Sequence, residues 1–202
     1  MDRAGLVTGR AREVATLVVT FGLSFLVLAI GFGDWRFGLG FVLLILVHEL
    51  GHVVEAKRQG LHVSLPVFIP LFGAFVTYRH SGLAPWRTAL ISLAGPLAGG
   101  IGAAVAWEAG SARSSHTLLV LAYYGFLFNA ANLLPVGFLD GGGAFRGMVD
   151  AWRRPAIRYE NGVPVEASAP ERNRAVQIAV LYGILAVALV ACAIATRHSG
   201  AF

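Results

Sequence analysis

The hydrophobic positions of this chain form long, nearly uninterrupted stretches, and polar residues gather between them. Five stretches approach the roughly 20 apolar residues that a helix needs to cross the hydrocarbon core of a bilayer. These stretches are residues 14–33, 37–56, 88–107, 117–136 and 175–195. The first is longer than the roughly 7–15-residue apolar region of a signal peptide and no small-residue cleavage pattern follows it, so we expect it to be retained. The pattern therefore predicts an all-α polytopic membrane protein with about five transmembrane helices.

Two connections between these stretches are long, and they differ in character. Residues 62–78, HVSLPVFIPLFGAFVTY, are apolar, β-branched and aromatic, and their prolines argue against a central strand while allowing edge strands. Non-helical backbone is tolerated at membrane depth only against protein or a wet cavity. We therefore expect a short membrane-associated β-hairpin between the second and third spans. Residues 153–174 are polar, and Asn161-Gly162 favours a two-residue hairpin turn there.

The composition agrees with a membrane protein and argues against a nucleic-acid partner. Hydrophobic residues make up 56% and charged residues 13%, whereas a soluble globular chain carries about 25% charge. Part of the surface must therefore face the lipid bilayer. The formal net charge of +5 does not indicate nucleic-acid binding, because the basic residues form no dense patch with aromatic residues between them. We expect one membrane-embedded domain over residues 1–202, with no room for a sizeable soluble domain.

The distribution of the 16 lysines and arginines predicts an orientation in the membrane. They are dense before the first span, after the second and after the fourth, and sparse in the other connections and the C-terminal tail. Because basic residues favour the cytoplasmic side, we expect a multi-pass protein of the cell membrane with a cytoplasmic N-terminus and an external C-terminus. Lys57 and Arg58 then mark the cytoplasmic interface just beyond the second span.

The second span, FVLLILVHELGHVVEAKRQG, contains three polar residues that need an explanation. His48 and His52 are four residues apart, so they share one face of a helix, and Glu49 lies one step round. A charged group at the centre of a bilayer costs about 2.5–3.5 kcal/mol, and a bound cation would offset that cost. This is the HExxH arrangement of two zinc ligands and a carboxylate beside the metal-bound water. The alternative is that each histidine is a hydrogen-bonded core residue.

A hydrolytic zinc site normally takes three protein ligands, so a third must come from elsewhere in the chain. Asp140 is the best candidate, within NLLPVGFLDGGG at the cytoplasmic end of the fourth span. The predicted topology places it at the same depth as His48 and His52. Pro135 and Gly137 interrupt the helix there, so an aspartate can face inward. The alternative is an interfacial aspartate that caps a helix after Leu139.

Three motifs give the chain a family resemblance. HELGH at residues 48–52 resembles the HExxH motif of the site-2 protease family of intramembrane zinc metalloproteases, and NLLPVGFLDG at residues 132–141 resembles that family's NxxPxxxxDG signature. SLAGPLAG at residues 92–99 is also typical of the family. The resemblance covers about residues 37–143, roughly half of the chain. It implies a catalytic core of three spans, with the C-terminal span, residues 175–195, outside that core.

The resemblance also implies roles for individual residues. His48, His52 and Asp140 would bind one Zn²⁺ per chain, and Glu49 would be the catalytic acid and base. The active site would lie in the cytoplasmic half of the bilayer. Many family members carry a PDZ or CBS module, and this chain has room for neither, which indicates a minimal form.

The sequence therefore predicts a zinc metalloendopeptidase that acts in regulated intramembrane proteolysis, hydrolysing peptide bonds in or near transmembrane segments of membrane-protein substrates. Asn132 is a candidate substrate contact or a helix-packing residue. The connection after the second span either binds substrate by strand addition or anchors its aromatic residues at the interface. Its candidate substrate-binding residues are Phe72, Gly73, Ala74 and Phe75.

The rival hypothesis is a non-proteolytic membrane metal-binding protein or transporter, which would need the ligands but not Glu49. A regulatory membrane protein or a homo-oligomer stays open as a partner. The sequence indicates neither the substrate nor the position of cleavage.

Overall fold

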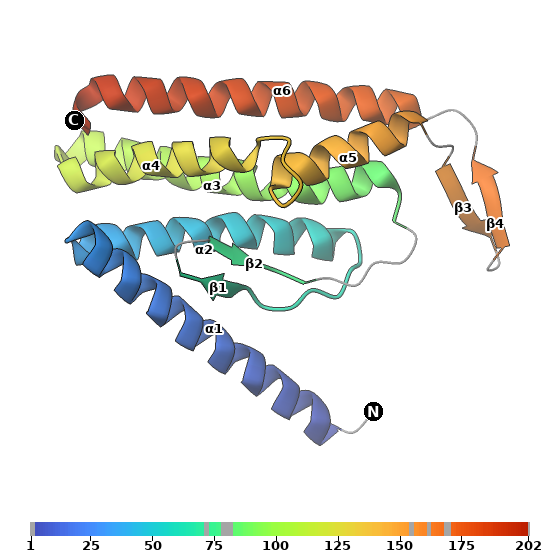
Figure 1. The fold of residues 1–202 in the computed structure, drawn as a ribbon, viewed down its shortest axis with the longest axis horizontal. Coiled ribbons are helices and arrows are strands. Elements are labelled where there is room, and N and C mark those ends of the chain that lie inside the picture. Colours follow the sequence, from blue (N-terminus) through green and yellow to red (C-terminus); the bar gives the residue numbers. More distant parts are fainter. Residues whose placement is uncertain are drawn as a thin grey trace.

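The computed structural model describes residues 3–70, 73–77, 83–153, 156–160, 163–167 and 171–201. Over these residues the chain forms six α-helices, two β-hairpins and a final π-helical turn (Figure 1). The helices are α1 (Arg3–Phe32), α2 (Trp35–Arg58), α3 (Pro85–Arg113), α4 (His116–Asn132), α5 (Asp140–Arg153), α6 (Glu171–Thr196) and η1 (Arg197–Ala201). The strands are β1 (Val67–Ile69), β2 (Gly73–Phe75), β3 (Ala156–Glu160) and β4 (Val163–Ala167).

The expected all-α membrane class is confirmed. Four helical segments in the described part of the chain are long and apolar enough to cross a bilayer. They are Arg10–Phe32, Trp35–Arg58, Pro85–Arg113 and Glu171–Ser199. Each corresponds to one of the expected spans, so the hydrophobic pattern located these helices correctly.

The fourth expected span, residues 117–136, is divided in the structure. α4 has 17 residues and ends at Asn132, and α5 begins at Asp140. In Figure 1, α4 and α5 follow one another in line and together run the length of α3. The interruption has a local cause: Pro135 has no backbone donor and disfavours helical geometry at Leu134. The sequence analysis anticipated the break, and gave a helix after Leu139 only in the alternative interpretation of Asp140.

The short hairpin expected after the second span is present. β1 and β2 pair antiparallel, with Phe68 opposite Ala74, and lie beside α2 and α1 (Figure 1). Phe68 is buried among apolar side chains of α1 and α2, including Leu28 and Val42, and its N–H donates to Thr20 Oγ1 at 3.2 Å. The hairpin thus packs against protein, the condition under which extended backbone is tolerated at this depth.

The second hairpin also follows the sequence pattern. β3 and β4 pair antiparallel, and Glu160 lies opposite Val163, so a two-residue connection joins them. Asn161 and Gly162, predicted to form that turn, lie outside the described residues.

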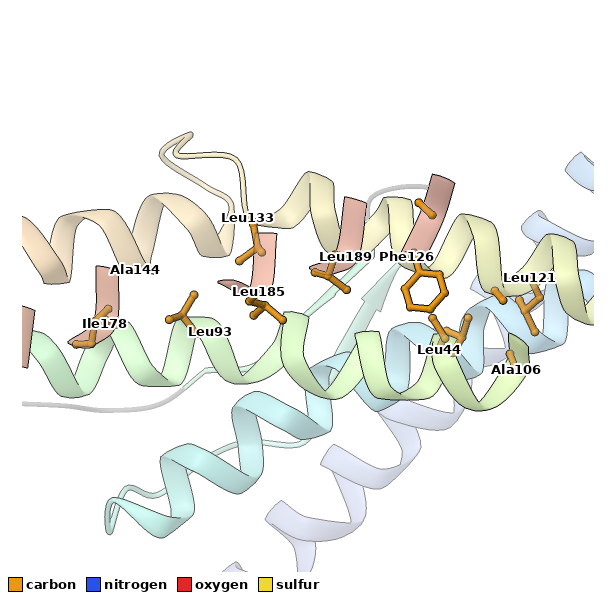
Figure 2. Close-up of a cluster of buried hydrophobic side chains, with 14 of the residues drawn as sticks. Leu44, Leu93, Ala106, Leu121, Phe126, Leu133, Ala144, Ile178, Leu185 and Leu189 are labelled. Atoms are coloured by element: carbon orange, nitrogen blue, oxygen red, sulfur yellow. The ribbon is translucent and has the colours of Figure 1, made fainter. Parts of the chain in front are cut away.

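The hydrophobic core centres on α3, which contacts α2, α4, α5 and α6. Figure 2 shows apolar side chains from these helices meeting along its length, among them Leu93 and Leu189. Small residues bring the backbones close: a Cβ on Gly125 of α4 would lie 2.8 Å from Leu44 Cδ1 and 3.0 Å from Ala103 Cβ. Close packing of α2, α4 and α5 around α3 positions the site described next.

Candidate metal centre

α2 brings two histidines and a glutamate into the interior. His48, Glu49 and His52 are 2%, 4% and 8% exposed, although the neighbouring α2 residues Val47 and Leu50 face outward. The Nε2 atoms of His48 and His52 lie 3.2 Å apart. The two imidazoles therefore meet at one point, as their four-residue spacing predicts.

The carboxylate of Asp140 completes this cluster. Its Oδ2 lies 3.0 Å from His48 Nε2, and its Oδ1 lies 3.3 Å from His52 Nε2. Asp140 is the first residue of α5, so its place at a helix N-terminus and its contact with both imidazoles are compatible. The structure thus brings together the three residues that the sequence analysis singled out as ligands.

Glycines after the break allow the chain to pass close to itself. A Cβ on Gly141 would meet the carbonyl oxygens of Leu133 and Leu134, and a Cβ on Gly142 would meet the carbonyl oxygen of Val136. Any larger residue would push the start of α5 away from the end of α4. These glycines therefore fix where Asp140 lies.

Two side chains bind backbone carbonyls that the break leaves free. The Tyr182 hydroxyl of α6 donates a hydrogen bond to the Leu133 carbonyl at the end of α4. Arg146 Nη1 donates to the Gly137 carbonyl at 3.0 Å. Such partners are required because carbonyl groups at the end of a helix have no partner within it.

The other ring nitrogen of each histidine is hydrogen-bonded. His52 Nδ1 lies 2.8 Å from the Ile91 carbonyl oxygen, and His48 Nδ1 lies 2.8 Å from Asn129 Oδ1. The amide orientation of Asn129 is set by Gly125, whose carbonyl accepts from Asn129 Nδ2 at 2.7 Å. Both partners of the imidazoles are acceptors, so each Nδ1 carries the hydrogen. The two Nε2 atoms are left with lone pairs facing the carboxylate.

This donor set fits a divalent metal ion. Two imidazole lone pairs and a carboxylate repel one another when buried together without a proton or cation between them. The ligand atoms lie within 4.8 Å of one another, and Asp140 Oδ2 is buried without a hydrogen-bond partner. Two histidines and one carboxylate form a ligand set of catalytic zinc, and hydrogen bonds on the far ring nitrogens are typical of zinc-binding histidines.

Glu49 lies beside this cluster without belonging to it. It is buried and interacts electrostatically with His52, His48 and Asp140. Among the described residues, only the two histidines and Asp140 form a metal-ligand group. Glu49 is therefore a buried carboxylate next to this group and not a member of it.

α3 supplies the wall behind the histidines. A Cβ on Gly95 would meet His52 Nε2 and would lie 2.9 Å from His48 Nε2, and a Cβ on Gly99 would meet Asn129 Oδ1. The sequence analysis attached no chemical role to these glycines. Their positions show that they make room for the imidazole pair and its hydrogen-bond partner.

The structure describes most of the substrate-binding candidates but shows no contact that assigns them a role. Asn132 is half-buried, and its amide donates to the Phe128 carbonyl at 3.0 Å. Gly73, Ala74 and Phe75 form β2, which packs beside α2, and Phe75 is 44% exposed. Phe72 lies outside the described residues. A substrate role for these residues stays a prediction.

Asn129 is the residue at this site that the sequence analysis missed. It is fully buried in α4 and contacts a histidine 81 residues away. The signal was present, because an amide in the apolar run FLFNAA needs a partner for the same reason as the histidines of α2 do.

Comparisons with known proteins match the part of the chain that contains this site. The model of a family described as Peptidase family M50 matches residues 36–114 and 101–164, which include all three ligand candidates but not α6. Two relatives from Arabidopsis thaliana, each named as a probable chloroplastic zinc metalloprotease, are EGY2, 28% identical over 50% of this chain, and EGY1, 29% identical over 52%. EGY1 of Oryza sativa subsp. japonica is 29% identical over 54%. The matched part of the chain spans 26–28% of the length of these relatives.

Proposed function

The chain belongs to peptidase family M50, and on that premise we propose that it is an intramembrane zinc metalloprotease that cleaves peptide bonds in or near transmembrane segments of membrane proteins. One observation carries the proposal. His48, His52 and Asp140 converge in the interior beside Glu49, in a chain with four helices able to span a bilayer.

Each polar residue of the site has a separate task in peptide hydrolysis. His48, His52 and Asp140 would hold Zn²⁺, which would acidify a water molecule and polarise a carbonyl group there. Glu49 accepts a proton as the water oxygen bonds to the peptide carbon, and later donates it to the amine that leaves when the C–N bond breaks. Because Glu49 is buried beside the ligands, it is close to both proton transfers and shielded from bulk water.

The substrate binds in an extended conformation. A transmembrane helix shields its peptide bonds within its own hydrogen-bonded turns, so it must unwind before water can attack. Among the described strands β2 pairs with β1 alone, so its other edge is a candidate for an added strand. We assign this edge, formed by Gly73, Ala74 and Phe75, and the Asn132 side chain to substrate binding, together with Phe72, which lies outside the described residues.

The arginine-rich end of the molecule faces the cytoplasm. α2 ends at Arg58 and α5 ends at Arg153, and these ends lie with the start of α6 on the same side of the molecule in Figure 1. Basic residues at helix ends favour the cytoplasmic side. The N-terminus is then cytoplasmic and the C-terminus external, in a multi-pass protein of the cell membrane.

The test separates catalysis from metal binding. Glu49→Gln removes the proton acceptor and keeps the ligands, so cleavage falls roughly 10²–10⁴-fold while zinc content is unchanged. Asp140→Ala removes a ligand, so both cleavage and zinc binding are lost. Membrane-protein fragments are compared by mass spectrometry between cells that express wild type and each variant, and zinc is measured by elemental analysis of the purified proteins. A Glu49→Gln protein as active as wild type would favour the rival metal-binding protein or transporter.

A further inference from the structure

We propose that Asn129 is a positioning residue of the metal centre, holding His48 in the orientation and tautomer that can bind a metal. The proposal rests on the proposed function because it concerns the same ligand set. It assigns a role to a residue of α4 that belongs to neither the HExxH motif nor the segment around Asp140.

The surroundings of Asn129 allow one arrangement of its amide group. The residue is 0% exposed, so bulk water does not reach its side chain. Its Nδ2 donates to the Gly125 carbonyl at 2.7 Å, one helical turn earlier, and its Oδ1 faces His48 Nδ1 at 2.8 Å. Exchanging the two ends of the amide would place its oxygen against the Gly125 carbonyl oxygen. The position therefore presents an acceptor to His48.

α3 is shaped to keep this amide in place. A Cβ on Gly99 would meet Asn129 Oδ1, and a Cβ on Gly95 would meet His52 Nε2. Gly99 thus makes room for Asn129, and Gly95 makes room for the imidazole ligands. Burying an amide in an apolar helix costs free energy unless it is hydrogen-bonded, and its contact with His48 offsets part of that cost.

The two histidines depend on different kinds of partner. His52 Nδ1 is held by the backbone carbonyl of Ile91, which no substitution removes. His48 Nδ1 is held by a side chain, so its tautomer depends on the identity of residue 129. Without an acceptor there, His48 is free to carry its hydrogen on Nε2, which would place an N–H where a metal needs a lone pair.

The experiment compares two kinds of substitution at this position. Asn129→Leu and Asn129→Ala remove the acceptor, and Asn129→Asp keeps it while losing the donor to Gly125. Loss of an outer partner of a metal-bound histidine typically lowers metal affinity 10–100-fold. We expect that loss for the leucine and alanine variants, and a loss of less than about tenfold for the aspartate variant. Zinc affinity is measured by chelator competition on the full chain in detergent.

A matched control removes another buried polar group. Thr196 is also 0% exposed and its hydroxyl donates to the carbonyl four residues earlier, at Cys192; in the described part of the chain this hydroxyl makes no hydrogen bond to a histidine. Thr196→Val should bind zinc as wild type does. Thermal unfolding of the metal-free proteins shows which variants fold.

A second readout does not depend on zinc. Ring ¹⁵N spectra of the metal-free protein should show a hydrogen on His48 Nδ1 in wild type and Asn129→Asp, whether or not Nε2 is also protonated, and an unprotonated Nδ1 in the leucine and alanine variants. Wild-type zinc affinity in folded Asn129→Leu and Asn129→Ala, or equal losses in all three variants, overturns the positioning role. A wild-type protein that binds zinc but cleaves nothing overturns the proposed function and leaves this inference standing.

Discussion

α2 and the α4–α5 segment, in which two helices are separated by a break, both supply groups to the candidate metal centre, but they are built in different ways. α2 is one continuous helix of 24 residues, and its periodicity alone places His48 and His52 on the same face. The α4–α5 segment is interrupted between Asn132 and Asp140, and the carboxylate of Asp140 lies at the start of α5. Two ligands can come from one helix, but a third approaching from another direction needs a second element.

The two constructions make different demands on the rest of the molecule. A continuous helix satisfies its own backbone hydrogen bonds, whereas a break leaves backbone groups at the helix ends that need other partners. Here Leu139 N–H donates to the Val136 carbonyl at 3.0 Å, and Tyr182 donates to the Leu133 carbonyl. The positions of His48 and His52 therefore depend mostly on the space beside α3, whereas the structure of the break depends on glycines and on α6.

The largest effect is expected from filling the space beside α2. In Gly95→Ala the new methyl group would meet His52 Nε2 and lie 2.9 Å from His48 Nε2, so the imidazoles or α3 must move. Overpacking of this kind costs about 1–3 kcal/mol, which corresponds to a loss of zinc affinity of roughly 10–100-fold. Gly100→Ala is the control, because its Cβ would meet only the flexible end of Leu189. Equal zinc affinities in the two variants would contradict this account of α3.

An intermediate effect is expected from disturbing the break. In Gly141→Ala the new Cβ would press against the carbonyl oxygens of Leu133 and Leu134, which shifts α5 and moves Asp140. Zinc affinity should fall by about tenfold, the lower end of the range for overpacking, because the ligands are displaced only indirectly. In the control Gly137→Ala, the nearest atom to the new Cβ is Arg146 Nη1 at 3.8 Å, and chelator competition should give the wild-type affinity.

The smallest effect is expected at the contact between α6 and the break. Tyr182→Phe removes the hydrogen bond to Leu133 and leaves the aromatic ring, which should lower the free energy of unfolding by about 0.5–1.5 kcal/mol. Thermal unfolding measures this loss, and the midpoint should fall by a few degrees. Gly183→Ala on the same helix meets nothing within 4 Å and should not lower the midpoint. If the two variants unfold at the same temperature, α6 does not support the break through this tyrosine.

Much of the site could be predicted from the sequence because its signals are local. Three polar residues in an apolar span, two of them histidines one helical turn apart, indicate a shared partner. The proline and glycines around Asp140 indicate a break. Asn129 was missed because a single amide in a span does not show which residue it contacts. α5 was expected only in the alternative interpretation of Asp140, because glycines at its start disfavour a helix, and only the space between α4 and α3 requires them there.

The sequence by itself determined the membrane class, the positions of the long helices, both hairpins and the pairing of His48 with His52. These depend on hydropathy and on helical or strand periods, which are properties of neighbouring residues. Only the tertiary structure decided that Asp140 meets those histidines, that Asn129 and Ile91 fix their far nitrogens, and that Tyr182 supports the break. Such contacts join residues as many as 92 positions apart, as in His48 and Asp140, and depend on how closely small residues let the helices pack.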